Sequence, residues 1–452
     1  MTNQAPTDLM TVMQQIQFEV ALDADDPRYV DTREARGSEQ TFQRLAKKFG
    51  FSALNRVFLP PASMHLLLFG HVGSGKTTEL RQYAQQLSAS GNYYVVDVDV
   101  MGKLDRNNLQ FSETMLVMAE RLTEQLGQDG FTISSDALEP VYQWFRHIEQ
   151  SGDEHRELAA SISGEMSAGI SLPGLFKLLN KITSTAKTGS SRKTAWREEV
   201  RNRFSELATA FNQLIAEAEQ ALAQAANVPH KRILFILDGT DKMKSEDTAR
   251  FFVQDAEQLL ALQTFVIYTA PLYLKYQGSL VGRLQDLVLP MIKLQDKSGA
   301  PYVPGVQAMR ELLLRRAAPQ LFQSEAVIDR LIDLSGGHPR ELLRLLQLCC
   351  EYADDVIGST ALDQAANQLA ADFRRFLTKE DYELLAQIDA ESSHQGTSEQ
   401  TQNLLYKLAL MEYNDGSWRR SHPAVRLLEG YQQAKQRLFP EIKVVRPSRQ
   451  KR

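Results

Sequence analysis

Residues 64–80 read MHLLLFGHVGSGKTTEL, and this stretch decides the fold. The apolar run at 66–69 predicts a strand buried inside a sheet. Apolar side chains recur at helical spacing over 78–88, which predicts a helix. The glycine-rich segment between them is therefore a strand-to-helix loop. Such a loop meets the helix N-terminus, where backbone N–H groups and the positive end of the helix dipole attract anions.

The loop has the composition of a phosphate-binding site. Gly70, Gly75, Lys76 and Thr77 fit the pattern G-x-x-x-x-G-K-[ST] without a gap. Glycines allow backbone angles at which successive N–H groups point at phosphate oxygens. Lys76 supplies a charge for the β- and γ-phosphates of a nucleotide, and the Thr77 hydroxyl can ligate Mg²⁺. The residues expected to bind the nucleotide are Gly70, His71, Val72, Gly73, Ser74, Gly75, Lys76, Thr77 and Thr78.

The overall composition is ordinary for a soluble globular protein. At 452 residues the chain is long enough for two or three domains. Hydrophobic residues make up 43% and charged residues 24% of the sequence, both within the usual range. The 51 basic and 56 acidic residues give a net charge of −5. Because no overall positive field is present, any contact with nucleic acid must be local.

We expect a cytoplasmic protein. The start of the sequence, MTNQAPTDLM, lacks the basic and apolar regions of a signal peptide. No apolar run approaches the roughly 20 residues that span a bilayer. The only cysteines, Cys349 and Cys350, are neighbours, which gives neither a disulfide framework nor metal-ligand spacing.

Residues 232–241, RILFILDGTD, form a second nucleotide signature. Their apolar run predicts a strand buried on both faces that ends at Asp238. An aspartate there can hold the Mg²⁺ shell beside Thr77. Gly239 takes the position where a general-base glutamate usually follows, and Asp241 is the nearest carboxylate that could polarise the attacking water. Hydrolysis is therefore expected to be slow, triggered by a partner, or catalysed by Asp241.

Two further side chains are candidates for the reaction. Residues 264–271 predict another buried strand, with Thr269 at its end, where it could sense the γ-phosphate. A helix is expected over 272–282, followed by a strand over 287–294. Arg283 at the end of that helix could reach a neighbouring subunit's γ-phosphate as an arginine finger, or be an ordinary surface arginine.

The segment 334–346, LSGGHPRELLRLL, is the distinctive piece of the following helical region. Its two glycines break one helix, and Pro339 begins the next. Arg340 falls in the first turn, where a cation opposes the helix dipole. An arginine directed at a bound phosphate resolves this conflict. His338 is expected to be a turn or capping residue.

The N-terminal part offers fewer signals. Residues 1–37 are polar and suggest an arm around the nucleotide site, and 38–49 predict a helix. A strand is expected over 94–100. Its Asp97 and Asp99 could lie near the site, or be solvated residues that cap neighbouring groups.

A long, mostly helical insertion is expected at 105–228, and its last helix spans 196–226. Within it, residues 161–192 mix glycine, serine and threonine with a short amphipathic piece at 175–182. This segment is either a flexible excursion with one docked helix or a contact with a partner or a membrane surface.

The C-terminal region has the pattern of a winged helix-turn-helix. Helices are expected over 362–376, 379–388 and 402–411, and a hairpin over 411–422. The candidate recognition helix carries one lysine and no arginine. Arg419 and Arg420 lie on the wing, and the basic tail at 443–452 could add a phosphate contact. This is little positive charge for a DNA reader, so a wing that docks on protein is at least as well supported.

The order of these parts resembles that of the AAA+/STAND ATPases, and among them the origin-recognition-like members. The parts are the motif at 70–77, the strands ending in Asp238 and Thr269, and the helix bearing Arg340. The resemblance covers about residues 40–430. It implies α/β architecture with a parallel five-stranded sheet, a helical lid with a sensor-2 arginine at Arg340, a C-terminal winged helix, and ATP with Mg²⁺. The expected divisions are 1–60 (N-terminal arm and helix), 61–304 (ATPase core with the 105–228 insertion), 305–358 (lid), 359–435 (winged helix) and 436–452 (basic tail).

Three functions remain open from the sequence. The first is an ATP-dependent switch that hydrolyses slowly and whose nucleotide state controls self-association or a protein partner; ATPases that it resembles act in bacterial regulation or defence. The second is a DNA-associated ATPase that uses the winged helix. The third, suggested by Gly239, is a nucleotide-binding scaffold that does not hydrolyse ATP.

Overall fold

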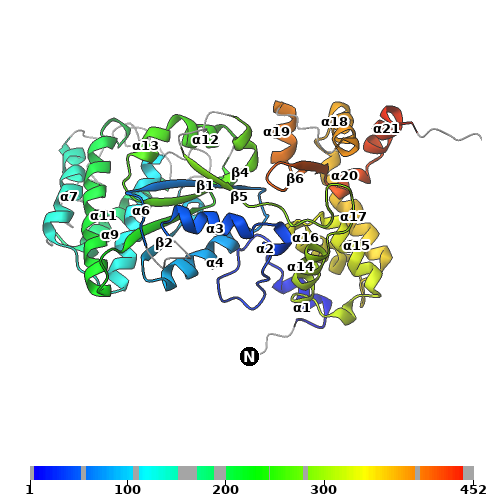
Figure 1. Ribbon diagram of the computed structural model, residues 1–452, viewed down its shortest axis with the longest axis horizontal. Coiled ribbons are helices and arrows are strands. Elements are labelled where there is room, and N and C mark those ends of the chain that lie inside the picture. Colours follow the sequence, from blue (N-terminus) through cyan, green and yellow to red (C-terminus); the bar gives the residue numbers. More distant parts are fainter. Residues whose placement is uncertain are drawn as a thin grey trace, which may run out of the picture.

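A five-stranded parallel sheet forms the centre of the protein in the computed structural model, which describes residues 5–51, 58–104, 111–150, 170–187, 200–243, 245–277, 284–391 and 398–440 (Figure 1). The strand order is β2-β3-β4-β1-β5. The strands are β1 (Met64–Gly70), β2 (Tyr93–Asp99), β3 (Arg232–Asp238), β4 (Phe265–Pro271) and β5 (Gln285–Val288). The predicted α/β class and parallel five-stranded sheet are confirmed.

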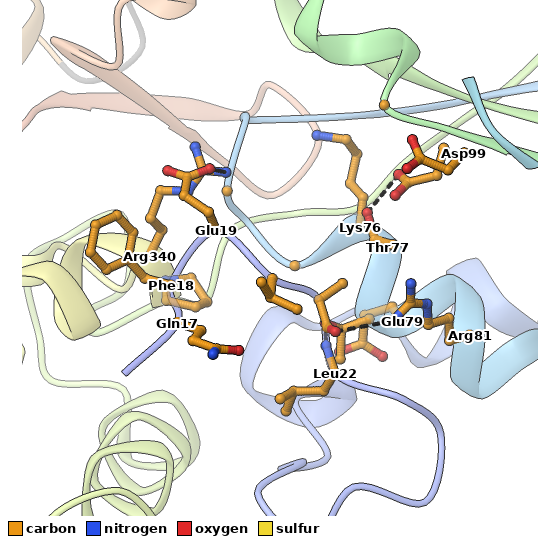
Figure 2. Close-up of a pocket in the computed structure, with 18 of the residues that line it drawn as sticks. Gln17, Phe18, Glu19, Leu22, Lys76, Thr77, Glu79, Arg81, Asp99 and Arg340 are labelled. Carbon is orange, nitrogen blue, oxygen red and sulfur yellow. Dashed lines mark hydrogen bonds and ion pairs between the residues drawn. The ribbon is translucent and has the colours of Figure 1, made fainter. Parts of the chain in front are cut away.

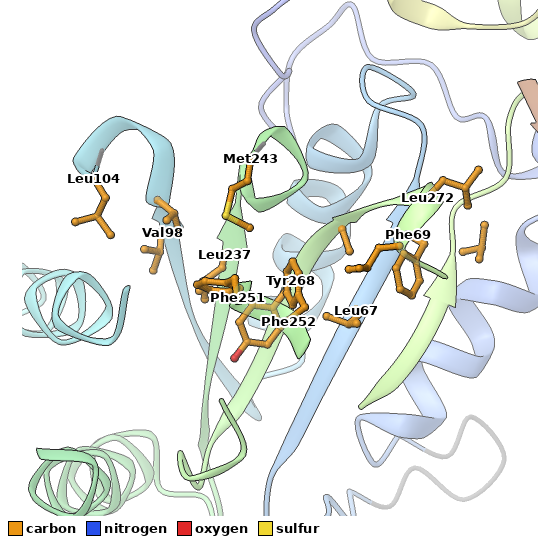
Figure 3. Close-up of a cluster of buried hydrophobic side chains, with 14 of the residues drawn as sticks. Leu67, Phe69, Val98, Leu104, Leu237, Met243, Phe251, Phe252, Tyr268 and Leu272 are labelled. Carbon is orange, nitrogen blue, oxygen red and sulfur yellow. The ribbon is translucent and has the colours of Figure 1, made fainter. Parts of the chain in front are cut away.

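The central strands are apolar on both faces because helices cover both. Along β1, Leu66 and Leu68 point to one side, and Leu67 and Phe69 to the other. Leu67 and Phe69 share an apolar cluster with residues of β3, β4 and the helices beyond them (Figure 3). This explains why the buried strands appear in the sequence as continuous apolar runs instead of alternating ones.

Helices α3 (Glu39–Lys48) and α4 (Lys76–Ala89) cover one face of the sheet, and insertion helices cover the other (Figure 1). The remaining helices of this region are α5 (Val100–Lys103), α6 (Phe111–Gln128), α7 (Ser135–Gln150), α9 (Leu172–Lys187), α11 (Phe204–Ala226), η2 (Thr240–Lys242), α12 (Ser245–Ala249), η3 (Arg250–Gln254), α13 (Ala256–Leu260) and η4 (Leu272–Gln277). Over its described residues the insertion is mostly helical, with an irregular segment at 129–134 between α6 and α7.

The amphipathic piece at 175–182, expected either as a docked helix or as a contact with a partner or a membrane surface, lies in α9. Leu175, Leu178, Leu179 and Ile182 are all buried, and α9 packs along α6. The apolar side is therefore covered by the protein's own insertion, which favours a docked helix over a membrane contact. Residues 161–169 and 188–192 lie outside the described residues. None of the described helices combines the length and the apolarity needed to cross a bilayer.

The described residues from 303 to 438 form a helical region that also contains the β6–β7 hairpin (Figure 1). Its elements are α14 (Val303–Leu314), η5 (Pro319–Leu321), α15 (Glu325–Ser335), α16 (Pro339–Tyr352), α17 (Ser359–Arg374), α18 (Lys379–Ala390), α19 (Glu399–Tyr406), β6 (Leu410–Tyr413), β7 (Trp418–Ser421), α20 (Pro423–Arg426) and α21 (Glu429–Leu438). The N-terminal helix α1 (Leu9–Gln15) packs against α16, and α2 (Arg33–Arg36) packs against α14.

The expected hairpin is present. Strands β6 and β7 pair antiparallel and are joined by a turn in which Asn414, Asp415 and Gly416 all have positive φ. Asparagine, aspartate and glycine are the residues that tolerate this conformation, so the turn forms where the sequence placed it.

The segment after β4 differs from the expectation. The strand expected at 287–294 is β5, which ends at Val288. Pro290 follows two residues later and has no N–H to donate to a ladder, and its carbonyl accepts instead from Arg36. The chain then turns toward the helical half, where the Lys293 N–H donates to the Ala35 carbonyl. The helix expected at 272–282 appears as η4, a 3-10 helix, and residues 278–283 lie outside the described residues.

Candidate nucleotide site

A cavity of about 910 Å³ opens at the carboxyl end of the sheet, where the N-terminal arm, the glycine-rich loop and the lid meet (Figure 2). The arm contributes Gln17 to Leu22, and the lid contributes Pro339, Arg340 and Leu343. Carboxyl ends of parallel strands are where open α/β sheets bind ligands. This cavity therefore lies where the motif at 70–77 requires a nucleotide.

The loop wraps around the N-terminus of α4, as its glycines predict. Gly73 and Gly75 have φ values of 85° and 98°, in the region that side chains with a Cβ rarely adopt. A Cβ on Gly73 would also lie 2.7 Å from Nε of Arg340. The Ser74 N–H donates to the His71 carbonyl at 3.1 Å, which closes the turn.

Lys76 is buried inside the loop and bonded to three acceptors. Its Nζ lies 2.6 Å from Oδ2 of Asp241 and donates to the carbonyls of Gly70 and His71 at 3.0 and 2.9 Å. Burial raises the pKa of Asp241, but the Lys76 charge, the hydrogen bonds from Lys76 and Thr269, and the Lys242 charge together hold that pKa below its ordinary value. Asp241 is therefore an ionised partner of Lys76.

Thr77 and Asp238 are brought together as the two motifs predict. The Thr77 hydroxyl donates to Oδ1 of Asp238 at 2.6 Å (Figure 2). A hydroxyl and a carboxylate are oxygen donors of the kind Mg²⁺ prefers, and nucleotide phosphates commonly complete its shell. These two residues fit Mg²⁺ and would hold it beside the phosphates.

Thr269 lies near the end of β4 (Phe265–Pro271), which matches the strand expected at 264–271, and its side chain is fully buried. Its hydroxyl donates to Asp241 at 3.3 Å, and it does not belong to the lining of the cavity. Asp241 lines the cavity, so the hydrogen bond to Asp241 connects Thr269 to it.

The lid presents Arg340 and His338 to the loop. Nη2 of Arg340 pairs with Glu19 of the arm at 3.0 Å, while its buried Nε has no hydrogen-bond partner among the described residues (Figure 2). His338 caps α16 as expected, since Nδ1 accepts from the Glu341 N–H, and its Nε2 lies 3.0 Å from the Val72 carbonyl. The lid and the glycine-rich loop are thus in direct contact.

Sequence patterns did not identify the residues that brace the loop from the arm. Arg36 is almost fully buried and donates at 2.7 Å to the Ser74 carbonyl, the Pro290 carbonyl and the Thr32 hydroxyl. Farther along the arm, the Leu22 N–H donates to the Thr78 hydroxyl at 3.2 Å. The contacts with Ser74, Pro290 and Thr78 follow no motif, because their partners are 38 to 254 residues apart in the sequence.

The C-terminal hairpin also contacts the loop. The Glu412 N–H donates to Nε2 of His71 at 2.9 Å. Burial, and after it the charge of Lys76, lowers the pKa of His71 to about 3, so this ring is neutral and can accept. Glu412 in turn pairs with Arg419 at 2.8 Å, and Tyr276 of η4 also donates to Glu412. The hairpin is therefore docked on the loop through His71 and on η4 through Tyr276.

The residues considered for DNA binding differ in their contacts. Arg419 is buried in that charge pair, whereas Arg420 lies over the ring of Trp418. The candidate recognition helix α19 packs on η4, with the rings of Tyr406 and Tyr273 5.2 Å apart. Arg283 and the tail from 441 onward lie outside the described residues, so the arginine-finger hypothesis stays a prediction.

Comparison with known proteins finds similar structures but no similar sequences. The sequence matches no protein-family model and no curated protein. One similar solved structure is a Walker-type ATPase of Pyrococcus abyssi, with 13% identity, 91% of this chain and 98% of that chain covered, and a TM-score of 0.41. Another is the ORC1 protein of Aeropyrum pernix in complex with DNA, with 14% identity, 93% and 98% covered, and a TM-score of 0.37.

The chain's own features assign the fold independently of these likenesses. The sheet has five parallel strands in the order β2-β3-β4-β1-β5. The phosphate-binding loop follows β1, and the carboxylate of Asp238 at the end of β3 meets Thr77. Strand order, loop and carboxylate together give this protein a P-loop fold, in which an open parallel sheet carries a phosphate-binding loop at the end of β1.

Proposed function

We propose that the protein is an ATP-dependent molecular switch that hydrolyses ATP slowly and whose nucleotide state controls self-association or a protein partner. One observation carries the proposal: the loop residues that would hold the triphosphate also touch the lid and the C-terminal hairpin. Val72 meets His338 of the lid, and His71 meets Glu412 of the hairpin. A change in the loop therefore acts on both modules at once.

The phosphates of a bound nucleotide would compete with protein carboxylates for two positively charged side chains. Lys76 is shared with Asp241, and Arg340 is shared with Glu19. A bound triphosphate would draw both side chains toward its β- and γ-oxygens. The loop, the lid and the arm would then repack together, since each contributes one partner of these contacts.

The expected rate is low. Gly239 cannot serve as a general base, and Asp241 is buried against Lys76. Thr77 and Asp238 would hold Mg²⁺, which would neutralise charge on the phosphates. A switch tolerates a slow hydrolytic step because its output is the difference between the two nucleotide states.

DNA binding through the wing is not favoured in this arrangement. Arg419 is buried and paired, and one side of α19 packs on η4. A protein-facing output agrees better with these contacts. We propose that ATP loosens the docked hairpin and so exposes a surface for a partner or for a second copy of the chain.

Replacement of Lys76 tests nucleotide binding. Lys76→Ala alone leaves the Asp241 carboxylate buried without its cation, at a cost of several kcal/mol. The informative variant is therefore Lys76→Ala with Asp241→Asn, measured against Asp241→Asn alone. We expect the double variant to bind ATP at least about 100-fold more weakly in calorimetric titration, a loss of about 2.7 kcal/mol.

Three results would contradict parts of the proposal. Equal ATP affinity in the double variant and its control would remove nucleotide binding by this loop. Unchanged size and unchanged hydrogen exchange of the hairpin with ATP would remove the switch. A complete lack of phosphate release over hours would leave a nucleotide-binding scaffold.

A further inference from the structure

A carboxylate on the strand next to β3 is placed for the reaction. Asp99 is the last residue of β2, and in the parallel register its partner is Asp238, the last residue of β3. Paired residues on neighbouring strands direct their side chains to the same face. That face is the one on which Thr77 donates to Asp238, and Figure 2 shows Asp99 beside this pair.

The other carboxylates around the end of β3 are already engaged. Asp238 accepts from Thr77, and Asp241 is paired with Lys76 at 2.6 Å. Asp97, two residues before Asp99 on the same face, lies 3.8 Å from Nε of Arg81. Burial raises the pKa of Asp97, and the charges of Asp238 and Asp99 add to this rise while Arg81 opposes it. Asp238, Asp241 and Asp97 therefore each have a side-chain partner.

Asp99 lines the cavity, and a backbone N–H group fixes its side chain. Its Oδ1 accepts from the Gly102 N–H at 2.9 Å and so caps α5. A carboxylate has about four acceptor sites on its two oxygens, so this cap leaves capacity for a water molecule.

We propose that Asp99, rather than Asp241, orients the attacking water and accepts its proton. The inference deepens the proposed function and rests on its ATP hydrolysis. In the step, the water oxygen bonds to the γ-phosphorus as the bond from that phosphorus to the bridging oxygen breaks. The bond's electron pair leaves with ADP, and the water proton passes to the Asp99 carboxylate. Asp241 instead positions Lys76.

Asp99→Asn is the decisive variant. Asparagine caps helices about as well as aspartate, so α5 keeps its cap while the base is lost. We expect single-turnover phosphate release to fall about 100-fold or more, with the ATP dissociation constant within about threefold of the unmodified protein. The matched control is Asp97→Asn, on the same face of the same strand, which should release phosphate within about threefold of the unmodified rate.

Two further variants separate a base from a structural role. Asp99→Glu keeps a carboxylate and should retain more activity than Asp99→Asn. Asp241→Asn should change ATP affinity together with rate, because it acts on Lys76. Phosphate release from Asp99→Asn at the unmodified rate, or an equal loss in Asp99→Glu, would overturn the assignment. If the unmodified protein binds ATP but releases no phosphate, the proposed hydrolysis itself fails and takes this inference with it.

Discussion

At the scale of single residues, the nucleotide site depends on side chains that approach the loop from behind. Arg36 is the clearest case, because one guanidinium ties three separate segments together. Its three hydrogen bonds, each of 2.7 Å, end on Thr32 in the arm, Ser74 in the loop and Pro290 after β5. A planar fork with fixed donors suits this task better than a flexible ammonium group.

Arg36→Ala should therefore weaken both the fold and the site. It leaves two buried carbonyls without donors, and each such loss costs about 1–3 kcal/mol. We expect the free energy of unfolding in urea to drop by about 2–4 kcal/mol and ATP to bind more weakly. Arg33→Ala is the control, since Arg33 makes an exposed pair with Asp31 and should cost less than about 1 kcal/mol. Equal losses in both variants would mean that Arg36 does not brace the loop.

At the scale of elements, the β6–β7 hairpin is the connection between the nucleotide loop and the C-terminal module. The antiparallel register places Glu412 directly opposite Arg419, and both side chains are buried. The Arg419 guanidinium also lies 4.7 Å from the ring centre of Tyr276 in η4. Tyr276 thus contacts both members of the pair, and the pair joins the hairpin to η4 through that side chain.

Glu412→Ala should release the hairpin. The change leaves Arg419 buried without its partner, and breaking a buried pair in this way costs about 3–5 kcal/mol. We expect faster amide hydrogen exchange over β6, β7 and η4, together with a lower melting temperature. Arg420→Ala removes the neighbouring arginine outside the pair and should leave exchange nearly unchanged. Exchange that is equally slow in both variants would show that the pair does not hold the hairpin.

The same elements show what the sequence could and could not predict. Strands β1, β3 and β4 are buried on both faces, so their apolar runs and the glycine-rich motif located them and brought Thr77 to Asp238. The hairpin followed from its turn residues. Arg419 was instead considered for DNA contact from the wing, because the sequence does not reveal which element will bury a charged side chain. The same limit hid Arg36, whose Pro290 partner lies 254 residues away.

At the scale of the whole molecule, the buried histidines should make the protein sensitive to acid. His65, His71, His338 and His422 are all buried. Burial lowers the pKa of His65 to about 4, of His71 and His422 to about 3, and of His338 well below its ordinary value of 6.5. The unfolded chain therefore binds protons near pH 6.5 that the folded chain does not. Stability is fully present above pH 6.5 and is lost as pH falls toward these folded-state values.

We expect the free energy of unfolding to be nearly constant between pH 8 and 7 and to fall steeply below about pH 6.5. Each such histidine contributes up to about 1.4 kcal/mol per pH unit. Glu341, whose pKa burial raises, works in the opposite sense and offsets part of the slope near pH 5. His422→Gln removes one titrating group and should reduce the slope by about 1.4 kcal/mol per pH unit. His230→Gln makes the same substitution at an exposed histidine and is the control. Urea unfolding at half-unit pH steps measures all three proteins, and a slope that His422→Gln does not reduce would mean that the buried ring is protonated in the folded state.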